Sequence, residues 1–316
     1  MPKVYTALLI ALLLLFYKPG HKVPTVGPMR IASYNLRYDS QPDNITVQQS
    51  IDALPNPLTS PRFLFKTGEQ PWSSRRIKVA QHLLSEGPAL IGFQEALIRQ
   101  VKDLAQLLGD EWAWLGVGRD DGAEGGEFCP IFYKKTQFKL ISHDSFWLSD
   151  FPFEPSKYPD AGSFRVCEVA RFTTTTVTNS TKTFTLINTH LDERSDRQRR
   201  LSASLLLTRA RYEAYTSGGP VFVTGDFNSA ATGYDSGAYQ IITGHIPPVP
   251  IDSTFEAKYA VPPDAFPQFI MQDLKAETPR MHISGDFATF TGFNRPGDPS
   301  VFTRVDFVFG GSNGGW

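Results

Sequence analysis

The sequence predicts an α/β (α+β) fold in which two packed β-sheets are covered by helices. Apolar, strand-like runs follow one another without intervening helices through the middle of the chain, between residues 112 and 191. Helical periodicity appears on either side of this region, at residues 72–84 and 201–215. Because helices and sheets each bury an apolar face, clustered strands flanked by helices are typical of layered domains.

The composition is typical of a globular domain with a sizeable apolar core. The chain has 316 residues, of which 41% are hydrophobic, 20% charged and 13% aromatic. Its 31 basic and 32 acidic side chains give a formal net charge of −1, which excludes a histone-like protein that binds duplexes through charge alone. Two cysteines cannot make a disulfide scaffold or, by themselves, a structural zinc site. We expect one domain over residues 23–316.

The expected elements follow from apolar periodicity, in chain order. Apolar runs predict strands at residues 29–36 and 89–95, and amphipathic spacing predicts helices at residues 72–84 and 99–108. Five strands follow, at residues 112–117, 129–134, 138–148, 164–176 and 183–191.

The last third of the chain returns to mixed elements. We expect a helix at residues 201–215, a buried strand at 220–224, a short helix at 266–275 and a last strand at 305–309. Residues 41–61 and 245–263 contain much proline and few periodic apolar residues, which predicts surface loops.

The N-terminus has the pattern of a secretory signal. Lys3 precedes an apolar run at residues 4–17, which is too short to cross a membrane core as a helix. We expect residues 1–22 to be a signal peptide or, because no clean small-residue cleavage site follows, an uncleaved signal anchor. The expected location is secreted or within the secretory pathway, and the alternative is a membrane-anchored protein.

Two further features suit that route. The triplets that begin at Asn44 and Asn179 are N-glycosylation sequons. In an oxidising compartment Cys129 and Cys167 could form a disulfide; alternatively, each is a free, buried apolar filler in its own strand.

Four of the apolar strands end on polar residues that suit metal or phosphate binding. These are Ser-Tyr-Asn at residues 33–35, Phe-Gln-Glu at 93–95, Asn-Thr-His-Leu-Asp at 188–192 and Gly-Asp-Phe-Asn at 225–228. Burying such groups is costly unless they are paired, so their recurrence predicts one shared site. The oxygen ligands of Glu95 and Asp226 suit Mg²⁺ or Mn²⁺ better than zinc. A hard ion of this kind commonly serves phosphoryl chemistry.

Taken in order, these residues resemble the endonuclease/exonuclease/phosphatase superfamily, which has the deoxyribonuclease I-like fold. The resemblance covers residues 30–309 and rests on Asn35, Glu95, His190, Asp226, Asn228 and Asp306. Within the family, the chain is similar to a secreted or membrane-associated subgroup related to deadenylases. The resemblance implies a four-layer sandwich of two mixed β-sheets flanked by helices, and an enzyme that hydrolyses phosphate esters.

The resemblance also implies roles for the matched positions. Glu95 would hold the catalytic Mg²⁺ or Mn²⁺, and Asn35 would help to place the ion and the phosphate. Asp226 would belong to the same metal site and would orient or deprotonate the attacking water. Asn228 would fix the scissile phosphate. In-line displacement requires these functions, because charge must be neutralised and the nucleophile positioned.

The remaining matched positions would contact the substrate or its leaving group. His190 would donate to a phosphate oxygen, with Glu127 as its orienting carboxylate. Asp192 and Arg194, just after the histidine, and Arg119 would contact substrate. The implied substrate is RNA or DNA, as for a 3'-5' RNA exonuclease, or a phosphorylated small molecule, as for a metabolite phosphatase. We expect the protein to be a monomer.

The resemblance ends before the family pattern does. The family continues beyond Asp306 into a further strand that begins with Ser-Asp-His, and no such motif follows Asp306 in this sequence. Asp306 would orient the histidine of that motif. We therefore expect a truncated domain without the final C-terminal strand. The alternative to an active hydrolase is a catalytically impaired relative that still binds phosphate.

Structural roles are the alternatives for the individual residues. Glu95 could cap the helix that follows it, and Asn35 and Asn228 could stabilise turns. His190 could be a core histidine with satisfied hydrogen bonds. The arginines within residues 194–200 are expected on a solvated helix face rather than along a polyanion track.

Overall fold

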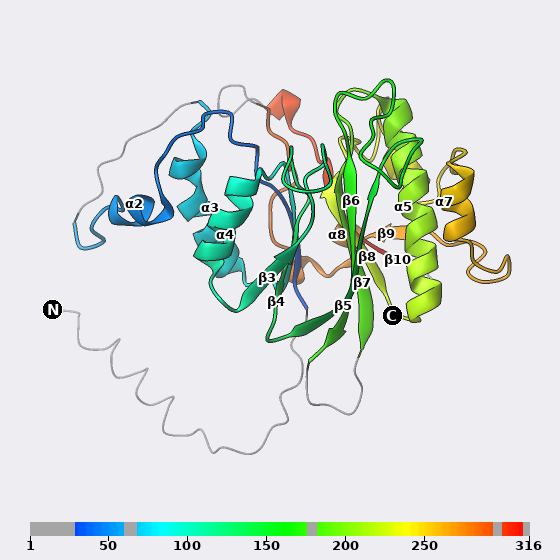
Figure 1. Cartoon of the computed structure of the whole chain (residues 1–316), viewed down its shortest axis with the longest axis horizontal. Helices are drawn as coiled ribbons and strands as arrows, with labels where there is room; N and C mark the ends of the chain where they lie inside the picture. The colour runs from blue at the N-terminus through cyan, green and yellow to red at the C-terminus, as the bar shows by residue number, and fades with distance from the viewer. Residues whose placement is uncertain (1–28, 60–67, 176–181, 293–298, 312–316) are drawn as a thin grey trace, which may run out of the picture.

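Two β-sheets face each other in the computed structural model, which describes residues 29–59, 68–175, 182–292 and 299–311. One sheet has four strands and the other has six. Helices cover the outer faces, so the layers run helix, sheet, sheet, helix (Figure 1). This architecture confirms the predicted sandwich of two mixed sheets flanked by helices.

The first sheet comes from the N-terminal part of the described chain. Its order is β1-β2-β4-β3, with bounds Ile31–Asn35, Leu90–Gln94, Ile131–Lys134 and Trp112–Leu115. β1 and β2 are parallel, and β4 is antiparallel to β2 and β3. The helices α3 (Trp72–Glu86) and α4 (Ile98–Leu108) cover the outer face (Figure 1). Every residue of β2 is buried, as expected for a strand covered on both faces.

The second sheet has the order β5-β6-β7-β8-β10-β9. The strand bounds are Phe138–Trp147, Val166–Thr174, Thr183–His190, Val221–Asp226, Asp306–Gly311 and Met271–Asp273 in that order. β7 and β8 are parallel and are joined by the long helix α5 (Asp196–Ser217). β10 is antiparallel to β8, so it begins at the edge where β8 ends.

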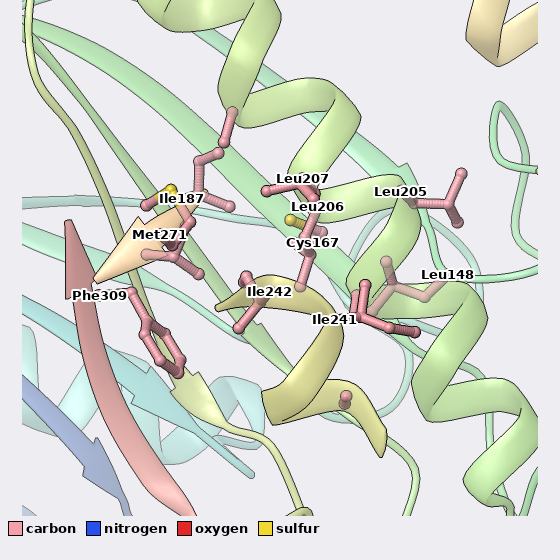
Figure 2. Close-up of a cluster of buried hydrophobic side chains, with 14 of the residues drawn as sticks. Leu148, Cys167, Ile187, Leu205, Leu206, Leu207, Ile241, Ile242, Met271 and Phe309 are labelled. Atoms are coloured by element: carbon pink, nitrogen blue, oxygen red, sulfur yellow. The ribbon is translucent and has the colours of Figure 1, made fainter. Parts of the chain in front are cut away.

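Helix α5 packs on the outer face of the second sheet and forms the largest apolar cluster. Figure 2 shows Leu206 of α5 beside Cys167 of the sheet and Leu205 near Leu148, in one cluster with Ile187 and with Ile242 from α6 (Gly237–Ile242). These side chains are fully buried. Close packing of α5 against this face restricts movement of the sheet, and with it movement of the strand ends.

A buried polar network joins the two sheets. The side-chain Nδ2 of Asn188 in β7 donates to the carbonyl oxygens of Phe93 at 2.8 Å and Cys129 at 2.9 Å. Its Oδ1 accepts from Gln94 Nε2 at 2.8 Å and from Thr224 Oγ1 at 3.0 Å. Because a satisfied buried network has few alternative arrangements, Asn188 fixes how the sheets sit on each other.

The two cysteines are buried and free, so the predicted alternative of a disulfide is wrong for this structure. Cys167 lies in the cluster under α5, whereas Cys129 packs with Trp147 and Val166 on the other face of the second sheet. Side chains of adjacent strand residues point to opposite faces, and Val166 and Cys167 show this alternation. Burial raises the pKa of both thiols, which keeps them protonated.

Three sequence predictions differ from the structure. Residues 266–275 do not form one helix: Phe266 has a positive φ of 51°, Met271–Asp273 pairs with β10 as β9, and only Leu274–Glu277 forms a helix, α8. The expected loop at 41–61 contains α2 (Val47–Asp52), and the expected loop at 245–263 contains α7 (Ser253–Lys258). Side-chain caps from Thr46 and Asp252 support these short helices.

Some predictions lie outside the described residues. These are the signal segment at residues 1–22 and the sequon at Asn179. Within the described ranges, no helix combines the length and apolar character needed to span a bilayer.

Candidate active site

The polar strand ends meet at one edge of the sandwich. Asn35 ends β1 and Glu95 follows β2, and because these strands are parallel, both residues lie at the same edge. His190 and Asp226 end the parallel strands β7 and β8. Asp306 begins β10 directly opposite Asp226. Each sheet therefore supplies part of one polar cluster, as the sequence pattern predicts.

Asn35 connects the two sheets within this cluster. Its Nδ2 donates to Glu95 Oε1 at 2.9 Å and to Asp226 Oδ2 at 2.9 Å. Its Oδ1 accepts from the backbone N–H of Arg37 at 2.8 Å. All of these contacts agree on one orientation of the amide, so Asn35 holds the two carboxylates at a fixed separation.

Glu95, His190 and Asp226 are arranged as a group that could hold a metal ion. One ligand atom from each lies within 4.8 Å of the others. Glu95 has a left-handed backbone, with φ 57°, and its Oε2 accepts from the backbone N–H of Tyr38 at 3.1 Å. A bulky residue held in this region is strained, and such strain is concentrated at functional sites. Glu95 does not cap the helix that follows it. The N-cap residue of α4 is Leu97, and the Glu95 carboxylate accepts from Asn35 and Tyr38 instead.

The electrostatics of the cluster fit a divalent cation. Burial and, to a lesser extent, the charge of Glu95 raise the pKa of Asp226 to about 6. Burial and the neighbouring Asp226 raise the pKa of Asp306 well above its usual value. Asp306 Oδ1 is buried and has no hydrogen-bond partner among the described residues. Crowded carboxylates of this kind are relieved when a cation binds between them.

Asn228 contacts both Asp226 and His190. Asn228 has a positive φ of 45°, and its backbone N–H donates to Asp226 Oδ1 at 2.9 Å. Its Nδ2 lies 3.0 Å from the carbonyl oxygen of Leu191 and 3.0 Å from His190 Nε2. Because the carbonyl requires a donor, His190 Nε2 accepts a hydrogen bond and its Nδ1 carries the proton.

Burial, with the help of two nearby arginines, keeps His190 neutral. Burial, followed by the charges of Arg165 and Arg119, lowers the pKa of His190 well below its usual value. Glu127, the predicted orienting carboxylate, lies 4.0 Å from His190 Nδ1, beyond hydrogen-bond range, and instead accepts from Arg119 Nη1 at 2.7 Å. Burial raises the pKa of Glu127 despite the nearby charge of Arg119.

Arg165 is a site residue that sequence reasoning missed. Its side chain is 4% exposed and lines a narrow space together with Arg119, Glu127 and His190. Its Nε donates to Asp192 Oδ2 at 3.2 Å and its Nη2 binds Glu193. The signal available in the sequence was an arginine next to apolar residues, directly before a strand, where a buried charge would need a partner.

Asp192 and Arg194, which were expected to contact substrate, lie in environments that differ from each other. Asp192 is fully buried, and both of its carboxylate oxygens accept backbone N–H groups, including those of Gly162 and Ser195. Although burial opposes it, these bonds and the Arg165 charge hold the pKa of Asp192 below its usual value. Arg194 is 75% exposed and pairs with Glu193 at 3.4 Å. Asp192 therefore organises the loop, while Arg194 lies on its surface.

Comparisons with known proteins agree with this geometry. A family model described as the endonuclease/exonuclease/phosphatase family matches residues 32–314. A search of curated proteins found no significant match.

Solved structures share the fold. An endonuclease/exonuclease/phosphatase from Bacteroides vulgatus is 27% identical, with a TM-score of 0.62, covering 89% of this chain and 86% of that one. A mannosyl-6-phosphatase from Bacteroides thetaiotaomicron is 24% identical, with a TM-score of 0.61, covering 90% of this chain and 86% of that one.

Proposed function

The chain belongs to the endonuclease/exonuclease/phosphatase family, and on that premise we propose that it hydrolyses a phosphate ester with the help of Mg²⁺ or Mn²⁺. One observation carries the proposal: ligand atoms of Glu95, His190 and Asp226 converge within 4.8 Å, although they come from two different sheets. Convergence from separate sheets is costly for three polar groups without a function.

The residues around this point have complementary tasks. A bound divalent ion would neutralise charge on the phosphate oxygens, and Glu95, Asp226 and His190 are the residues that would hold it. Asp226, with its pKa raised to about 6, is ionised at neutral pH and yet more basic than an ordinary aspartate. It is therefore suited to accept a proton from an attacking water.

Asn35 and Asn228 would hold the groups that surround the phosphate. Both N–H donors of Asn35 are used by Glu95 and Asp226, and those of Asn228 by Leu191 and His190, so either amide would contact a phosphate oxygen only by exchanging one of these bonds. His190 is neutral and its Nε2 accepts from Asn228, so in this state Nε2 does not donate to a phosphate oxygen, and a cation bound at Nε2 would replace the hydrogen bond from Asn228.

A turnover screen tests the proposal. Purified full-length protein would be incubated with Mg²⁺ or Mn²⁺ and with RNA and DNA oligonucleotides, sugar phosphates including mannose 6-phosphate, and other phosphorylated metabolites. Glu95→Gln removes the charge at constant volume, so we expect it to abolish metal-dependent hydrolysis and leave the thermal midpoint nearly unchanged. Glu111→Gln, which makes the same change at an exposed glutamate that pairs with the part-buried Lys134, is the matched control. Turnover at the wild-type rate by Glu95→Gln would refute the site assignment.

The second candidate function is that of a catalytically impaired relative that still binds phosphate. The buried Oδ1 of Asp306, which has no partner among the described residues, fits cation binding and therefore does not by itself require turnover. Binding of Mn²⁺ and inorganic phosphate without turnover of any compound in the screen would favour this alternative.

We also propose that the protein acts as a monomer, which light scattering would check.

A further inference from the structure

The turn that follows β1 holds an arginine in a strained conformation beside the proposed ion site. Among the described residues, Arg37, Glu95, Asn228 and Phe266 are the non-glycine residues with positive φ. Glu95 and Asn228 belong to the candidate site, and Arg37, with φ 55°, lies next to Glu95. Left-handed backbone is costly for an arginine, so it persists only where the surroundings impose it.

A part-buried arginine and a buried glutamine bind the backbone of this turn and impose its conformation. Arg75 donates from Nη1 to the carbonyl oxygen of Leu36 at 2.5 Å and from Nη2 to that of Arg37 at 2.9 Å. Gln100, which is fully buried, donates from Nε2 to the carbonyl oxygen of Arg37 at 3.1 Å. The backbone N–H of Arg37 is bound to Asn35 Oδ1. The direction in which the Arg37 side chain leaves the turn is therefore fixed.

The side chain of Arg37 lies between Glu69, Tyr38 and Glu95. Its Nε donates to Glu69 Oε1 at 3.1 Å, and its guanidinium lies over the ring of Tyr38, 4.4 Å from the centroid. Its Nη1 lies 3.7 Å from Glu95 Oε2, which is an ion pair longer than a hydrogen bond. The side chain is 36% exposed, so it can be reached from solvent.

We propose that Arg37 binds the phosphoryl group of the substrate, donating from its guanidinium to a non-bridging phosphate oxygen beside Glu95. The inference rests on the proposed function, because it requires a phosphate at that place. A positive charge next to a metal-binding carboxylate weakens metal binding, so support of the metal does not explain Arg37. A planar guanidinium does match the geometry of phosphate.

Like Arg37, the other arginines near the site pair with carboxylates, but they lie beside His190 and are less exposed. Arg119 pairs with Glu127 at 2.7 Å, and Arg165 pairs with Asp192 at 3.2 Å and with Glu193. Their side chains are 15% and 4% exposed, against 36% for Arg37. Arg37 is therefore the better placed guanidinium for a ligand that enters from solvent on the Glu95 side.

The test uses two titrations, of which only the phosphate titration is expected to show weaker binding. Full-length protein and Arg37→Gln would be titrated by calorimetry with Mn²⁺ alone, and with inorganic phosphate in a buffer containing Mg²⁺. We expect Arg37→Gln to weaken phosphate binding about tenfold, because a charge-assisted hydrogen bond is lost. We expect its Mn²⁺ affinity to stay the same or to rise by up to about fivefold, because a like charge near Glu95 is removed.

The controls separate this inference from a structural role. Arg30→Gln makes the same charge change at the opposite end of β1, where Arg30 pairs with Glu86, and it should alter neither titration. Arg37→Lys keeps the charge and should bind phosphate more tightly than Arg37→Gln. If both affinities fall together in Arg37→Gln, if phosphate affinity is unchanged, or if Arg37→Lys binds no better than Arg37→Gln, the inference is overturned.

Failure of the proposed function gives a different result. Wild-type protein that binds neither Mn²⁺ nor phosphate would overturn both the proposed function and the role of Arg37. Wild-type protein that binds both ligands, with phosphate affinity unaffected by Arg37→Gln, would overturn only the role of Arg37.

Discussion

Asp226 is the residue whose chemistry depends most on what binds beside it. Its carboxylate accepts from Asn35 Nδ2 and from the backbone of Asn228, yet burial and Glu95 still raise its pKa to about 6. The folded state therefore binds this proton more tightly than the unfolded state does. A raised carboxyl pKa contributes stability below the unfolded value, about 4, and that contribution is lost as the pH rises through the folded value.

We predict that the metal-free protein becomes less stable between about pH 4 and pH 6 because of Asp226. In EDTA-treated protein, the free energy of unfolding should fall over this range by up to about 3 kcal/mol more in wild type than in Asp226→Asn. Adding Mn²⁺ at pH 7 should restore stability to wild type only. Urea unfolding at a series of pH values measures both slopes, and equal slopes would show that Asp226 does not titrate in this range.

At the scale of residues, the sequence identified the candidate metal ligands better than it identified the arginines of the site. Asn35, Glu95 and Asp226 were predicted to meet because each ends an apolar strand, and the structure places them together. Arg37 and Arg165 could not be found in this way, since an arginine in a sequence does not reveal whether its guanidinium reaches solvent or a buried carboxylate. Their positions depend on tertiary contacts with Glu69 and Asp192.

At the scale of elements, the N-terminus of α5 is held by one carboxylate. Asp192 accepts from the backbone N–H groups of Gly162, Arg194 and Ser195, and from Arg165 Nε. It therefore ties the loop before β6 to the start of the helix that covers the second sheet. The same tie keeps the Arg165 guanidinium near His190.

We predict that Asp192→Asn lowers the free energy of unfolding by about 2–4 kcal/mol, because an amide NH₂ would replace an acceptor and leave Arg165 with less compensation. The comparison is the urea midpoint at constant slope. Asp160→Asn, which changes an exposed contact with Arg197, should have almost no effect. A change in Asp192→Asn as small as in this control would mean that the loop rearranges to satisfy the same donors.

Elements with long apolar periodicity were predicted correctly. Elements whose formation depends on a helix cap or on a neighbouring strand were not. Apart from β9, the strands of both sheets follow the expected ranges closely, as do α3, α4 and α5, although α5 begins earlier, at Asp196, because Ser195 caps it. The short helices α2 and α7 depend on caps from Thr46 and Asp252 rather than on periodicity. β9 forms only because β10 lies beside it, which a local pattern cannot show.

At the scale of the whole molecule, Asn44 allows the predicted secretory route to be tested. We propose that the protein enters the secretory pathway, and Asn44 is exposed just before α2. In a eukaryotic secretory host, we predict glycan on Asn44 that a glycosidase removes and that Asn44→Gln prevents. Asn179→Gln serves as the comparison, since that sequon lies outside the described residues. Recovery of unglycosylated protein in the cytosol alone would contradict the prediction.

The two sheets must also keep a fixed separation, because each supplies part of the site. Gly92 of β2 lies against Asn188 and Thr224 of the other sheet. A Cβ atom on Gly92 would lie 2.2 Å from Thr224 Oγ1 and 2.4 Å from Asn188 Oδ1. Neither atom can move cheaply, since Asn188 also binds the carbonyl oxygens of Phe93 and Cys129. Glycine is required here by the close approach of the sheets.

We predict that Gly92→Ala destabilises the protein by about 2–4 kcal/mol, through overpacking and loss of buried hydrogen bonds. It should also weaken Mn²⁺ binding and lower any turnover by at least about tenfold, because the 2.9 Å link from Asn35 to Asp226 crosses the same interface. Ser33→Ala, at the paired position on β1, removes only a 3.3 Å contact from Gln94 and should cost less than about 1 kcal/mol. Urea unfolding and Mn²⁺ calorimetry measure both effects. If Gly92→Ala lost stability but kept wild-type Mn²⁺ affinity, the ion site would not depend on the separation of the two sheets.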